Sequence, residues 1–299
     1  MPTFSVIIPT HNRAHVLRDA VDSVLAQTLS DYEILVVDDG STDDTASLLA
    51  QYGGRILFVY QENAGPAAAR NRGLEMARGR FIAFLDSDDA WAPWTIETLA
   101  RAVEQFDSPA LVAGRGTSWT SRPQVHREAF QCRSSENFLA ASRAHSAFFG
   151  MPGLAIRADV LRTVGGFRHR LRAAEDQDLC LRLGDAVGFV QIDAPILFFQ
   201  RTDLEHLSGH VGHAIDAVDV VIEGERQGSY PGGTGLARTR RAMICALARR
   251  TAVMCSRAGE AAAALRIYWR CFAWHVALQR WRFLLGFPLL IARSAMRRA

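Results

Sequence analysis

The sequence lacks lysine, so all 34 of its basic residues are arginine. Arginine suits bidentate phosphate contacts, but we interpret the absence of lysine as a bias of genome composition rather than a sign of function. The five cysteines are widely spaced and contain no CxxC pair. This spacing argues against a zinc site and is typical of buried thiols in a reducing compartment.

Long apolar runs and the common nucleotide-binding glycine motifs are also absent. No stretch reaches the roughly 18 apolar residues that span a bilayer, and no secretory signal precedes the first predicted strand. No GxGxxG follows that strand, and no GxxxxGK[ST] occurs. Gly232–Gly235 lies late in the chain with no strand before it, and we predict a linker there. These absences argue against dinucleotide-binding and P-loop proteins.

What the chain does contain is an alternation of short apolar strands with amphipathic helices. With 299 residues, 49% of them hydrophobic, it can bury a large core. Strands alternating with helices of about 10 to 15 residues predict an α/β fold with a mostly parallel sheet. The predicted strands of the first third are Phe4–Ile8, Glu33–Val37, Ile56–Tyr60 and Phe81–Leu85, and the helices between them are Ala14–Gln27, a helix from Asp44, and Ala67–Arg78.

Polar loops follow these strands, and the richest in acids is Asp86–Asp89. In parallel sheets, ligands bind beyond the carboxyl ends of the strands, so we expect the loops at 10–13, 38–43 and 86–89 to open on one edge. Asp86 and Asp88 are two residues apart, and in extended backbone both side chains leave the same side. A divalent cation would relieve the repulsion within this cluster. Taken alone, the motif is better explained by a solvated loop that caps a helix.

The later chain is less regular. A helix is predicted from Pro93 and a weaker strand at 111–113, but 115–150 has no clear period and is the kind of loop region that carries specificity. Strands are predicted at 151–157, 189–192 and 196–200. The acid-rich run Ala174–Leu179 opens a helix, for which capping is the simple explanation when the run is seen alone. Further helices are predicted at 212–225, 236–256 and 260–280.

The C-terminal third is strongly basic. From Leu236 onward there are thirteen arginines and one acid, Glu260. The tail from Trp281 interleaves arginine with leucine and aromatic residues, so it could lie on an anionic membrane surface. Equally, it could form a helix that packs back on the domain. No recognised nucleic-acid motif is present, and no nucleic-acid partner is expected.

Four motifs together resemble the family 2 glycosyltransferases, GT-A enzymes that move a sugar from a nucleotide diphosphate to an acceptor. They are SVIIPTHNR at 5–13, VVDDGSTDDT at 36–45, NAGPAAARNRGLEMARGRFIAFLDSDD at 63–89, and GGF followed by AEDQDL at 165–179. The resemblance covers roughly 4–208. It implies a GT-A domain at 1–210, with a nucleotide-binding half to about 114 and an acceptor half from about 115, and leaves 211–299 as a helical, arginine-rich extension.

By this resemblance, a set of residues would border the donor nucleotide. Asp39 would accept a hydrogen bond from N3–H of a uracil or thymine, since a carboxylate can only accept, and Asp38 would orient its loop. Gly65 would let backbone pass close to the donor. The whole implied set is Pro9, Thr10, Asn12, Arg13, Asp39, Asn63, Gly65, Arg70, Asp86 and Ser87.

The same resemblance implies a Mg²⁺ or Mn²⁺ site and a general base. Asp88 and Asp86 would serve the metal, with Asp89 as an alternative ligand and His206 as the candidate for a later one. Asp176 would take the proton of the acceptor hydroxyl, and Glu175 would orient the acceptor. The metal would neutralise the leaving nucleotide diphosphate as a Lewis acid.

We therefore expect a metal-dependent inverting glycosyltransferase that uses a UDP- or dTDP-sugar in glycan or polysaccharide biosynthesis. Its acceptor would be a glycan, a lipid-linked molecule or a small molecule. The alternatives are a non-catalytic nucleotide-sugar or saccharide-binding protein, and a sugar nucleotidyltransferase, which would need a glycine-rich basic loop after the first strand. The expected location is cytoplasmic, with peripheral attachment to the inner face of the membrane as an open alternative.

Overall fold

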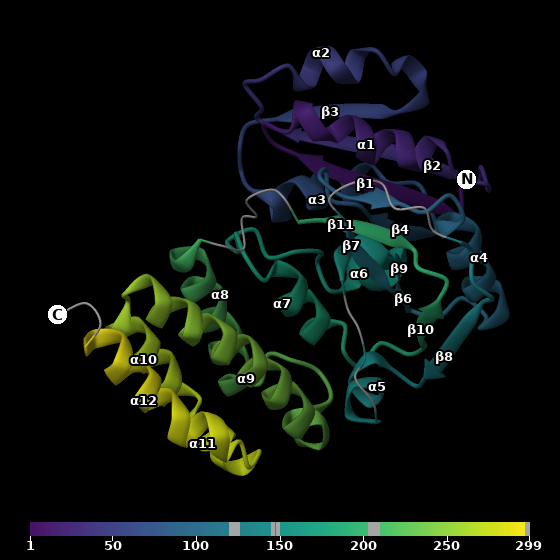
Figure 1. Ribbon diagram of the computed structural model, residues 1–299. Coiled ribbons are helices and arrows are strands. Elements are labelled where there is room, and N and C mark those ends of the chain that lie inside the picture. The colour runs from purple at the N-terminus through teal and green to yellow at the C-terminus, as the bar shows by residue number, and fades with distance from the viewer. Residues whose placement is uncertain (120–125, 145–146, 148–149, 203–209, 297–299) are drawn as a thin grey trace. The chain divides into compact units, whose positions relative to one another are not determined.

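The chain folds into two compact units in a computed structural model (Figure 1), which describes residues 1–119, 126–144, 147, 150–202 and 210–296. The side chains of residues 292–296 are not part of that description. Unit 1 comprises Met1–Arg170 and Leu183–Glu205, and unit 2 comprises Leu171–Arg182 and His206–Ala299. Each unit is described by itself below.

Unit 1 is built on an eight-stranded sheet with the strand order β3-β2-β1-β4-β9-β6-β10-β8. The neighbours β3, β2, β1 and β4 run parallel, as do β6 and β10. β9 runs antiparallel to both β4 and β6, and β8 runs antiparallel to β10. The strands are β1 (Phe4–Thr10), β2 (Tyr32–Asp39), β3 (Leu57–Gln61), β4 (Phe81–Phe84), β6 (Leu111–Gly114), β8 (Gln131–Ser135), β9 (Leu154–Arg157) and β10 (Phe189–Ala194). The predicted mostly parallel α/β sheet is confirmed.

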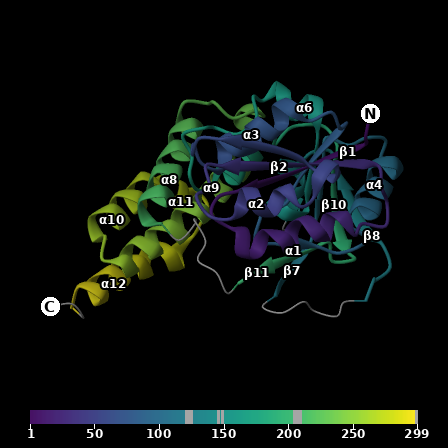
Figure 2. The same cartoon turned by 90° about the horizontal axis from the view of Figure 1, so that it is seen from above.

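Helices cover both faces of this sheet, as Figure 2 shows for α3 on one side and α1 on the other. The period of two along β1 explains this: Val6 and Ile8 belong to the core that α1 and α4 share, whereas Ile7 meets α3. A Cβ on Gly73 would lie 2.6 Å from Ile7, so glycine allows α3 to approach the sheet closely. The helices of unit 1 are α1 (Ala14–Leu25), α2 (Thr45–Ala50), α3 (Pro66–Met76), α4 (Thr95–Gln105), α5 (Phe138–Ala144) and α6 (Ala158–Thr163), with 3₁₀ turns at Gly53–Arg55 and Met151–Gly153.

A second, three-stranded sheet of unit 1 combines β11, which overlaps the strand predicted at 196–200, with two short strands that the sequence did not predict. Its order is β5-β11-β7, with β5 at Ala90–Trp91, β7 at Gly116–Trp119 and β11 at Phe198–Arg201. The strands are only two to four residues long, too short to show an alternating pattern. Of the region 115–150, β7, β8 and α5 are regular structure in the described residues.

Unit 2 is helical and has its own apolar core. Its helices are α7 (Glu175–Arg182), α8 (Val211–Arg226), α9 (Gly233–Ala258), α10 (Ala261–Arg270), α11 (Phe272–Ala277) and α12 (Trp281–Met296). Aliphatic and aromatic side chains from α7 to α12 form one buried cluster. Within the described residues, none of the helices combines the length and apolar character that crossing a bilayer requires.

Two helix boundaries of unit 2 differ from the sequence prediction. The predicted linker at Gly232–Gly235 is helical from Gly233 onward, and Gly232 caps the helix with φ 83°. The predicted single helix 260–280 is interrupted at Cys271 (φ −104°, ψ 4°), which ends α10 and precedes α11. The apolar residues keep their helical spacing across this break, so the sequence pattern did not show that one helix ends and another begins there.

Candidate functional site

The loops that follow β1 and β2 are joined by hydrogen bonds at the carboxyl edge of the sheet. His11 Nδ1 donates to the carbonyl oxygen of Asp39 at 2.8 Å. Asn12 has a left-handed backbone (φ 51°), and its N–H donates to Ser41 Oγ at 2.8 Å while its Oδ1 accepts from Thr42 N at 2.8 Å. The two motifs, almost thirty residues apart, therefore form one hydrogen-bonded rim.

Asp39, at the end of β2, is buried and oriented by the segment that begins α3. Its Oδ1 accepts from Gln61 Nε2 at 2.7 Å and from Ala64 N at 2.8 Å, and its Oδ2 accepts from Gly65 N at 2.8 Å. A carboxylate has about four acceptor positions, so one position on Oδ2 remains for a further donor. Gly65 (φ 92°) precedes Pro66, the first residue of α3.

The loop after β2 is closed by its own acids. Asp38 Oδ1 accepts from Ser41 N at 2.9 Å, the loop-orienting contact that the sequence led us to expect. Asp43 accepts from Ala14 N through Oδ2, and from Thr45 N and Oγ1 through Oδ1. Burial raises the pKa of Asp43, but the hydrogen bonds from Thr45 and Ala14 outweigh it, and the net pKa is lowered. Asp43 thereby ties the starts of α1 and α2 together.

The acids after β4 each face a different cation or donor. Asp86 Oδ1 lies 2.7 Å from Nη2 of Arg70 on α3, and Asp88 Oδ2 lies 3.5 Å from Nη1 of Arg13, which precedes α1. Ser87 between them is buried. Thus Arg13 and Arg70, both predicted as donor-site residues, contact the two acids predicted for the metal.

Asp89 points toward β11. Its Oδ1 accepts from Arg201 N at 3.0 Å, and the residue is only 2% exposed. Burial, and then the nearby charge of Asp86, raise the pKa of Asp89 to about 8, despite the hydrogen bond from Arg201. Its carboxyl group is thereby engaged in attaching the acidic loop to the small sheet.

Sequence reasoning missed Arg201 as a member of this site. Its Nη2 lies 2.7 Å from Asp19 Oδ2 of α1, its Nε donates to the carbonyl oxygen of Asp88 at 3.2 Å, and its guanidinium stacks on Trp119 at 4.6 Å from the ring centroid. Arg201 connects parts of the chain up to 182 residues apart. The sequence RTDLEHLS at 201–208, only a loose match to the family pattern, directed attention to His206 and not to Arg201.

Pro9 and Thr10 end β1 beside this rim and are buried. Thr10 pairs with Asp38 in the β1–β2 register. Among the described residues, the buried Thr10 Oγ1 has no hydrogen-bond partner. A buried hydroxyl without a partner is costly in a folded chain, and a ligand at this edge would relieve that cost.

Asn63 and the GGF motif are held by equally specific contacts. Asn63 Nδ2 lies 3.2 Å from the ring nitrogens of His11. Asn71 Nδ2 donates to Phe167 O at 2.8 Å, and Asn71 Oδ1 accepts from Phe167 N at 2.8 Å. The Phe167 ring lies under the Arg70 guanidinium at 5.5 Å. The GGF motif is therefore fastened to the helix that carries Arg70.

The predicted base and its neighbour lie in the first turn of α7, in unit 2. Glu175 and Asp176 are half-buried, and Asp176 Oδ1 accepts from Gln177 N at 2.7 Å. Asp178, in the same first turn, is fully buried and accepts from Tyr230 Oη at 2.9 Å and from Arg182 Nε at 2.8 Å. Asp178 is thus a structural acid that fixes α7 in unit 2.

The oxygen ligands present fit a Mg²⁺ or Mn²⁺ ion that is bound together with phosphates. Asp86 and Asp88 are hard anionic ligands on one short loop, and their present partners are the cations Arg70 and Arg13. Among the described residues there is no group of three acids, histidines or cysteines spaced to hold a metal alone. Mg²⁺ commonly takes only one or two carboxylates and completes its shell with substrate phosphates and water. The candidate ligand His206 lies outside the described residues.

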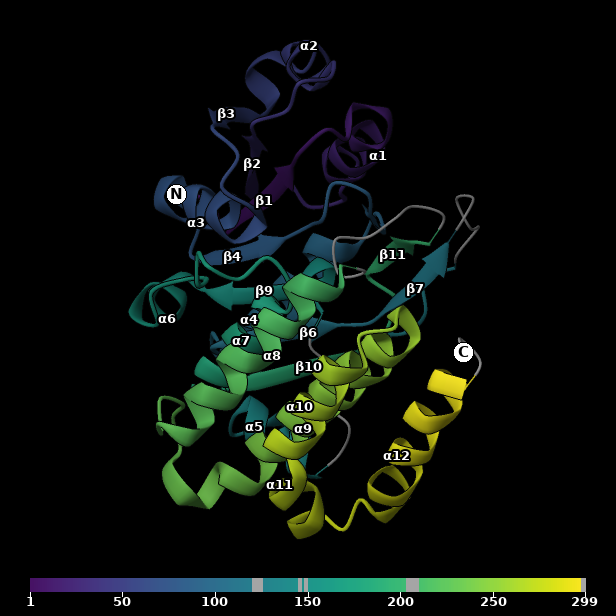
Figure 3. The same ribbon diagram turned by 90° about the vertical axis from the view of Figure 1, so that its left-hand side faces the viewer.

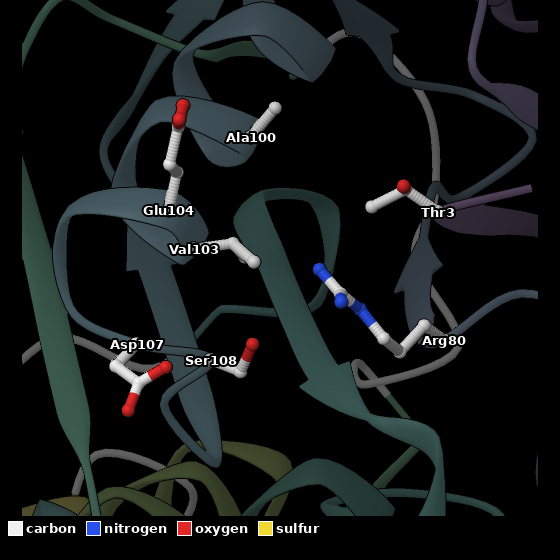
Figure 4. A pocket seen from close by; sticks show the side chains of 7 residues that line it. All are labelled: Thr3, Arg80, Ala100, Val103, Glu104, Asp107 and Ser108. Carbon is white, nitrogen blue, oxygen red and sulfur yellow. The ribbon is translucent and has the colours of Figure 1, made fainter.

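A separate hollow of about 370 Å³ lies at the opposite, amino edge of the sheet (Figure 4). Thr3 and Arg80, which precede β1 and β4, and the C-terminal part of α4 form its wall. None of the predicted donor-site residues lines it. Its lining carries charges of both signs, Arg80 on one side and Glu104 and Asp107 on the other, and indicates no particular ligand.

Comparisons with known proteins agree with this arrangement. Residues 5–165 match the model of Glycosyl transferase family 2. The uncharacterized glycosyltransferase RP339 of Rickettsia prowazekii is 38% identical over 205 residues, which are 67% of this chain and 64% of that protein. The putative teichuronic acid biosynthesis glycosyltransferase TuaG of Bacillus subtilis is 50% identical over 94 residues, 30% of this chain and 37% of TuaG. The chain thus spans less than two thirds of either relative.

Among solved structures, S. aureus TarS 1–349 in complex with UDP-GlcNAc superposes with a TM-score of 0.68 at 23% identity, covering 84% of this chain and 72% of that one. At this identity the likeness concerns the fold, and it confirms the predicted GT-A architecture. The family model covers more than half of the chain and includes the loops after β1, β2 and β4. The chain therefore belongs to glycosyl transferase family 2.

Proposed function

We propose that this chain transfers a sugar, with inversion, from a UDP- or dTDP-sugar to an acceptor hydroxyl, with the help of a divalent metal. One observation carries the proposal: three strand-end loops and the start of α3 are joined at one edge of unit 1 through Asp39, Asp86 and Asp88. That edge of a parallel sheet is where ligands bind in such folds.

Asp39 is our candidate for reading the nucleobase. Three donors already hold its carboxylate, so it cannot rotate freely, and one acceptor position on Oδ2 is left. Uracil and thymine offer an N3–H donor, whereas cytosine has an unprotonated N3. We therefore expect UMP to bind and CMP to be rejected, because N3 of cytosine and Oδ2 of Asp39 are both acceptors and cannot form a hydrogen bond with each other. Thr10 Oγ1 is available on the same edge.

Asp88 and Asp86 would hold the metal. When bound, the metal would act as a Lewis acid that neutralises charge on the leaving nucleotide diphosphate. Arg13 and Arg70 each pair with one of the two carboxylates before the donor arrives and so offset the repulsion between them. The donor then finds a loop that is already ordered.

Asp176 is our candidate for the general base, with Glu175 orienting the acceptor. An acceptor hydroxyl is a weak nucleophile until its proton is removed, and a half-buried carboxylate that is not a metal ligand can accept that proton. In an inverting displacement, one such base suffices. The amide N–H of Gln177 donates to Asp176 Oδ1 at 2.7 Å and so orients this carboxylate.

The acceptor class follows from relatives rather than from the site. TuaG is named for teichuronic acid biosynthesis, and TarS was solved with UDP-GlcNAc. By analogy, we propose that the acceptor is a glycan, a lipid-linked molecule or a small molecule in polysaccharide biosynthesis.

A thermal-shift screen of nucleotide sugars with and without Mn²⁺ tests the donor and the metal. A ligand that binds only the folded state raises the melting temperature. We expect UDP- or dTDP-sugars to raise it in the presence of Mn²⁺, and GDP- and CMP-sugars to leave it unchanged. Stabilisation that is equal with and without Mn²⁺ would contradict metal dependence.

Two substitutions separate the proposed roles. Asp88→Asn should abolish the Mn²⁺-dependent shift, whereas Asp176→Asn should keep it and lose transfer, measured as release of nucleoside diphosphate. Asp107→Asn, at an exposed position of left-handed backbone that asparagine tolerates, is the control and should change neither. Wild-type turnover in Asp176→Asn would overturn the base assignment. Donor binding with no turnover for any acceptor would indicate a non-catalytic binding protein. Release of pyrophosphate would indicate a nucleotidyltransferase.

A further inference from the structure

The outer face of α12 is apolar and exposed, although the opposite face of the same helix is already buried. Leu284, Phe287 and Ile291 point into the core of unit 2, and Tyr268 Oη donates to the carbonyl oxygen of Leu284 at 2.9 Å. Trp281, Leu285 and Leu289, four residues apart, share the other side, where they are 53%, 72% and 63% exposed. Surface helices normally turn a polar face to water.

The outer face of α12 is therefore defined by Trp281, Leu285 and Leu289, with Leu290 beside them at 40% exposure. Figure 3 shows α12 as the last helix of unit 2, near α9 and α11. Single exposed apolar residues need no explanation, but a contiguous stripe along a helix marks an interaction surface.

The charge around this face is of one sign. Residues 261–299 contain seven arginines and no acid. Two of them, Arg266 and Arg270 on α10, both form ion pairs with Asp219 of α8. Arg266 Nη2 lies 3.2 Å from Asp219 Oδ2, and Arg270 Nη1 contacts Asp219 Oδ1 more closely, so these arginines hold α10 against α8. Arg280 and Arg282, at the start of α12, are exposed and form no ion pair among the described residues.

We propose that the outer face of α12 docks the protein on the surface of an anionic phospholipid bilayer. Leu285 and Leu289 would enter the boundary between headgroups and acyl chains, Trp281 would sit at headgroup depth, and Arg280 and Arg282 would contact lipid phosphates. This combination of a leucine stripe, an interfacial tryptophan and flanking arginines is that of a helix lying in the membrane plane.

Two other occupants fit less well. A second copy of the chain on a two-fold axis would place the same face against itself, and residues 261–299 contain no acid that could pair with Arg280 or Arg282 across such an interface. A protein partner generally requires about one hydrogen bond per 100–200 Å² of interface, and the stripe offers apolar side chains only. A bilayer needs no such directional partners.

This docking goes beyond sugar transfer, and its test needs neither donor nor acceptor. The full-length chain is sedimented with vesicles of phosphatidylcholine alone, or of phosphatidylcholine with phosphatidylglycerol. We expect binding to the anionic vesicles that weakens as salt is added, because exposed charges are screened, and little binding to the neutral ones.

Three variants make the test specific. Leu285→Gln/Leu289→Gln should weaken vesicle binding by about tenfold or more, and Arg280→Gln/Arg282→Gln should weaken it by about tenfold on anionic vesicles only. Leu57→Gln/Val187→Gln removes two exposed apolar side chains from unit 1, at 40% and 75% exposure, and should bind as the wild type does. Circular dichroism melts verify that each variant is folded.

Three results would overturn the proposal. The first is a wild-type chain that does not bind anionic vesicles, and the second is a control pair that loses binding as strongly as the leucine pair. The third is a dimer, seen by sedimentation velocity without vesicles, that Leu285→Gln/Leu289→Gln converts to a monomer, since that would assign the face to a second copy. Failure of vesicle binding leaves nucleotide binding and transfer unaffected, so it is distinguishable from failure of the transferase proposal.

Discussion

Asn71 holds the backbone of Phe167 with both ends of its carboxamide, at 2.8 Å in each direction. The contact crosses 96 residues and joins α3 to the GGF motif. Gly166 (φ 64°) makes this approach possible, because a Cβ there would lie 2.4 Å from Asn71 Oδ1. Gly166 is thus explained by the space that a buried amide requires, whereas a Cβ on Gly165 (φ 75°) would meet nothing within 4 Å.

Asn71→Ala should destabilise the protein by about 3 kcal/mol, because it leaves a buried N–H and a buried C=O of Phe167 without partners. Urea unfolding followed by tryptophan fluorescence measures this loss. Arg72→Ala on the same helix is the control: it removes an exposed ion pair with Glu75 and should cost less than about 1 kcal/mol. Equal costs for the two variants would show that the Phe167 contact contributes nothing special.

Gly40→Ala and Gly53→Ala form a matched pair that isolates one contact of the donor loop. Both glycines have positive φ, 78° and 54°, so alanine strains the backbone by about 1 kcal/mol or somewhat more at each. A Cβ at Gly40 would lie 2.7 Å from Asn63 N, whereas nothing lies within 4 Å at Gly53. We expect Gly40→Ala to lose more stability in urea and to weaken nucleotide binding as Asn63 moves, while Gly53→Ala retains binding. Identical losses would argue against the role of Asn63.

Arg201→Gln should weaken Mn²⁺-dependent nucleotide binding by about tenfold, equivalent to about 1.4 kcal/mol. The substitution removes the guanidinium contacts to Asp19, the Asp88 carbonyl and Trp119, so the acidic loop loses its connection to α1. Titration calorimetry with a nucleoside diphosphate provides the measurement. Arg133→Gln, which breaks a two-point ion pair with Asp193 elsewhere in unit 1, should leave that affinity unchanged. The prediction is wrong if both variants bind nucleotide equally well.

The lowered pKa of Asp43 predicts a pH-dependent contribution to stability. A carboxyl whose pKa is lower in the folded state stabilises that state above its unfolded value, 3.8, and this contribution disappears as pH falls through the folded value. The difference in urea midpoint between wild type and Asp43→Asn should therefore be present at pH 7 and shrink below about pH 4. Asp44→Asn removes a neighbouring charge that makes no side-chain cap bond and should change the midpoint little at pH 7. A difference that grows on acidification would have the wrong sign.

The sequence predicted the fold class and the first four strands because their signals are local. An apolar run of four to eight residues, followed by a polar loop and then a helical period, occurs three times before Phe81, and each repeat forms a strand and a helix. The contacts of Asp38, Arg13 and Arg70 lie within those motifs. The family resemblance is confirmed by the family model, whereas the individual catalytic roles stay predictions.

What escaped prediction depends on distant partners. β9 enters the sheet antiparallel between β4 and β6, a choice set by packing against both neighbours. Arg201 becomes part of the acidic loop only because β11 pairs with β5. The break at Cys271 likewise could not be predicted, because the helical spacing of apolar residues continues through it.

The helix α3 sets the positions of several side chains of the donor site. Gly65 at its start positions Asp39, and Arg70 and Asn71 further along position Asp86 and Phe167. Each residue turns a helix by about 100°, so one insertion between 65 and 70 would swing the arginine and the amide away from their targets together, even with every motif residue retained. The segment 65–70 therefore tolerates substitutions more readily than insertions or deletions.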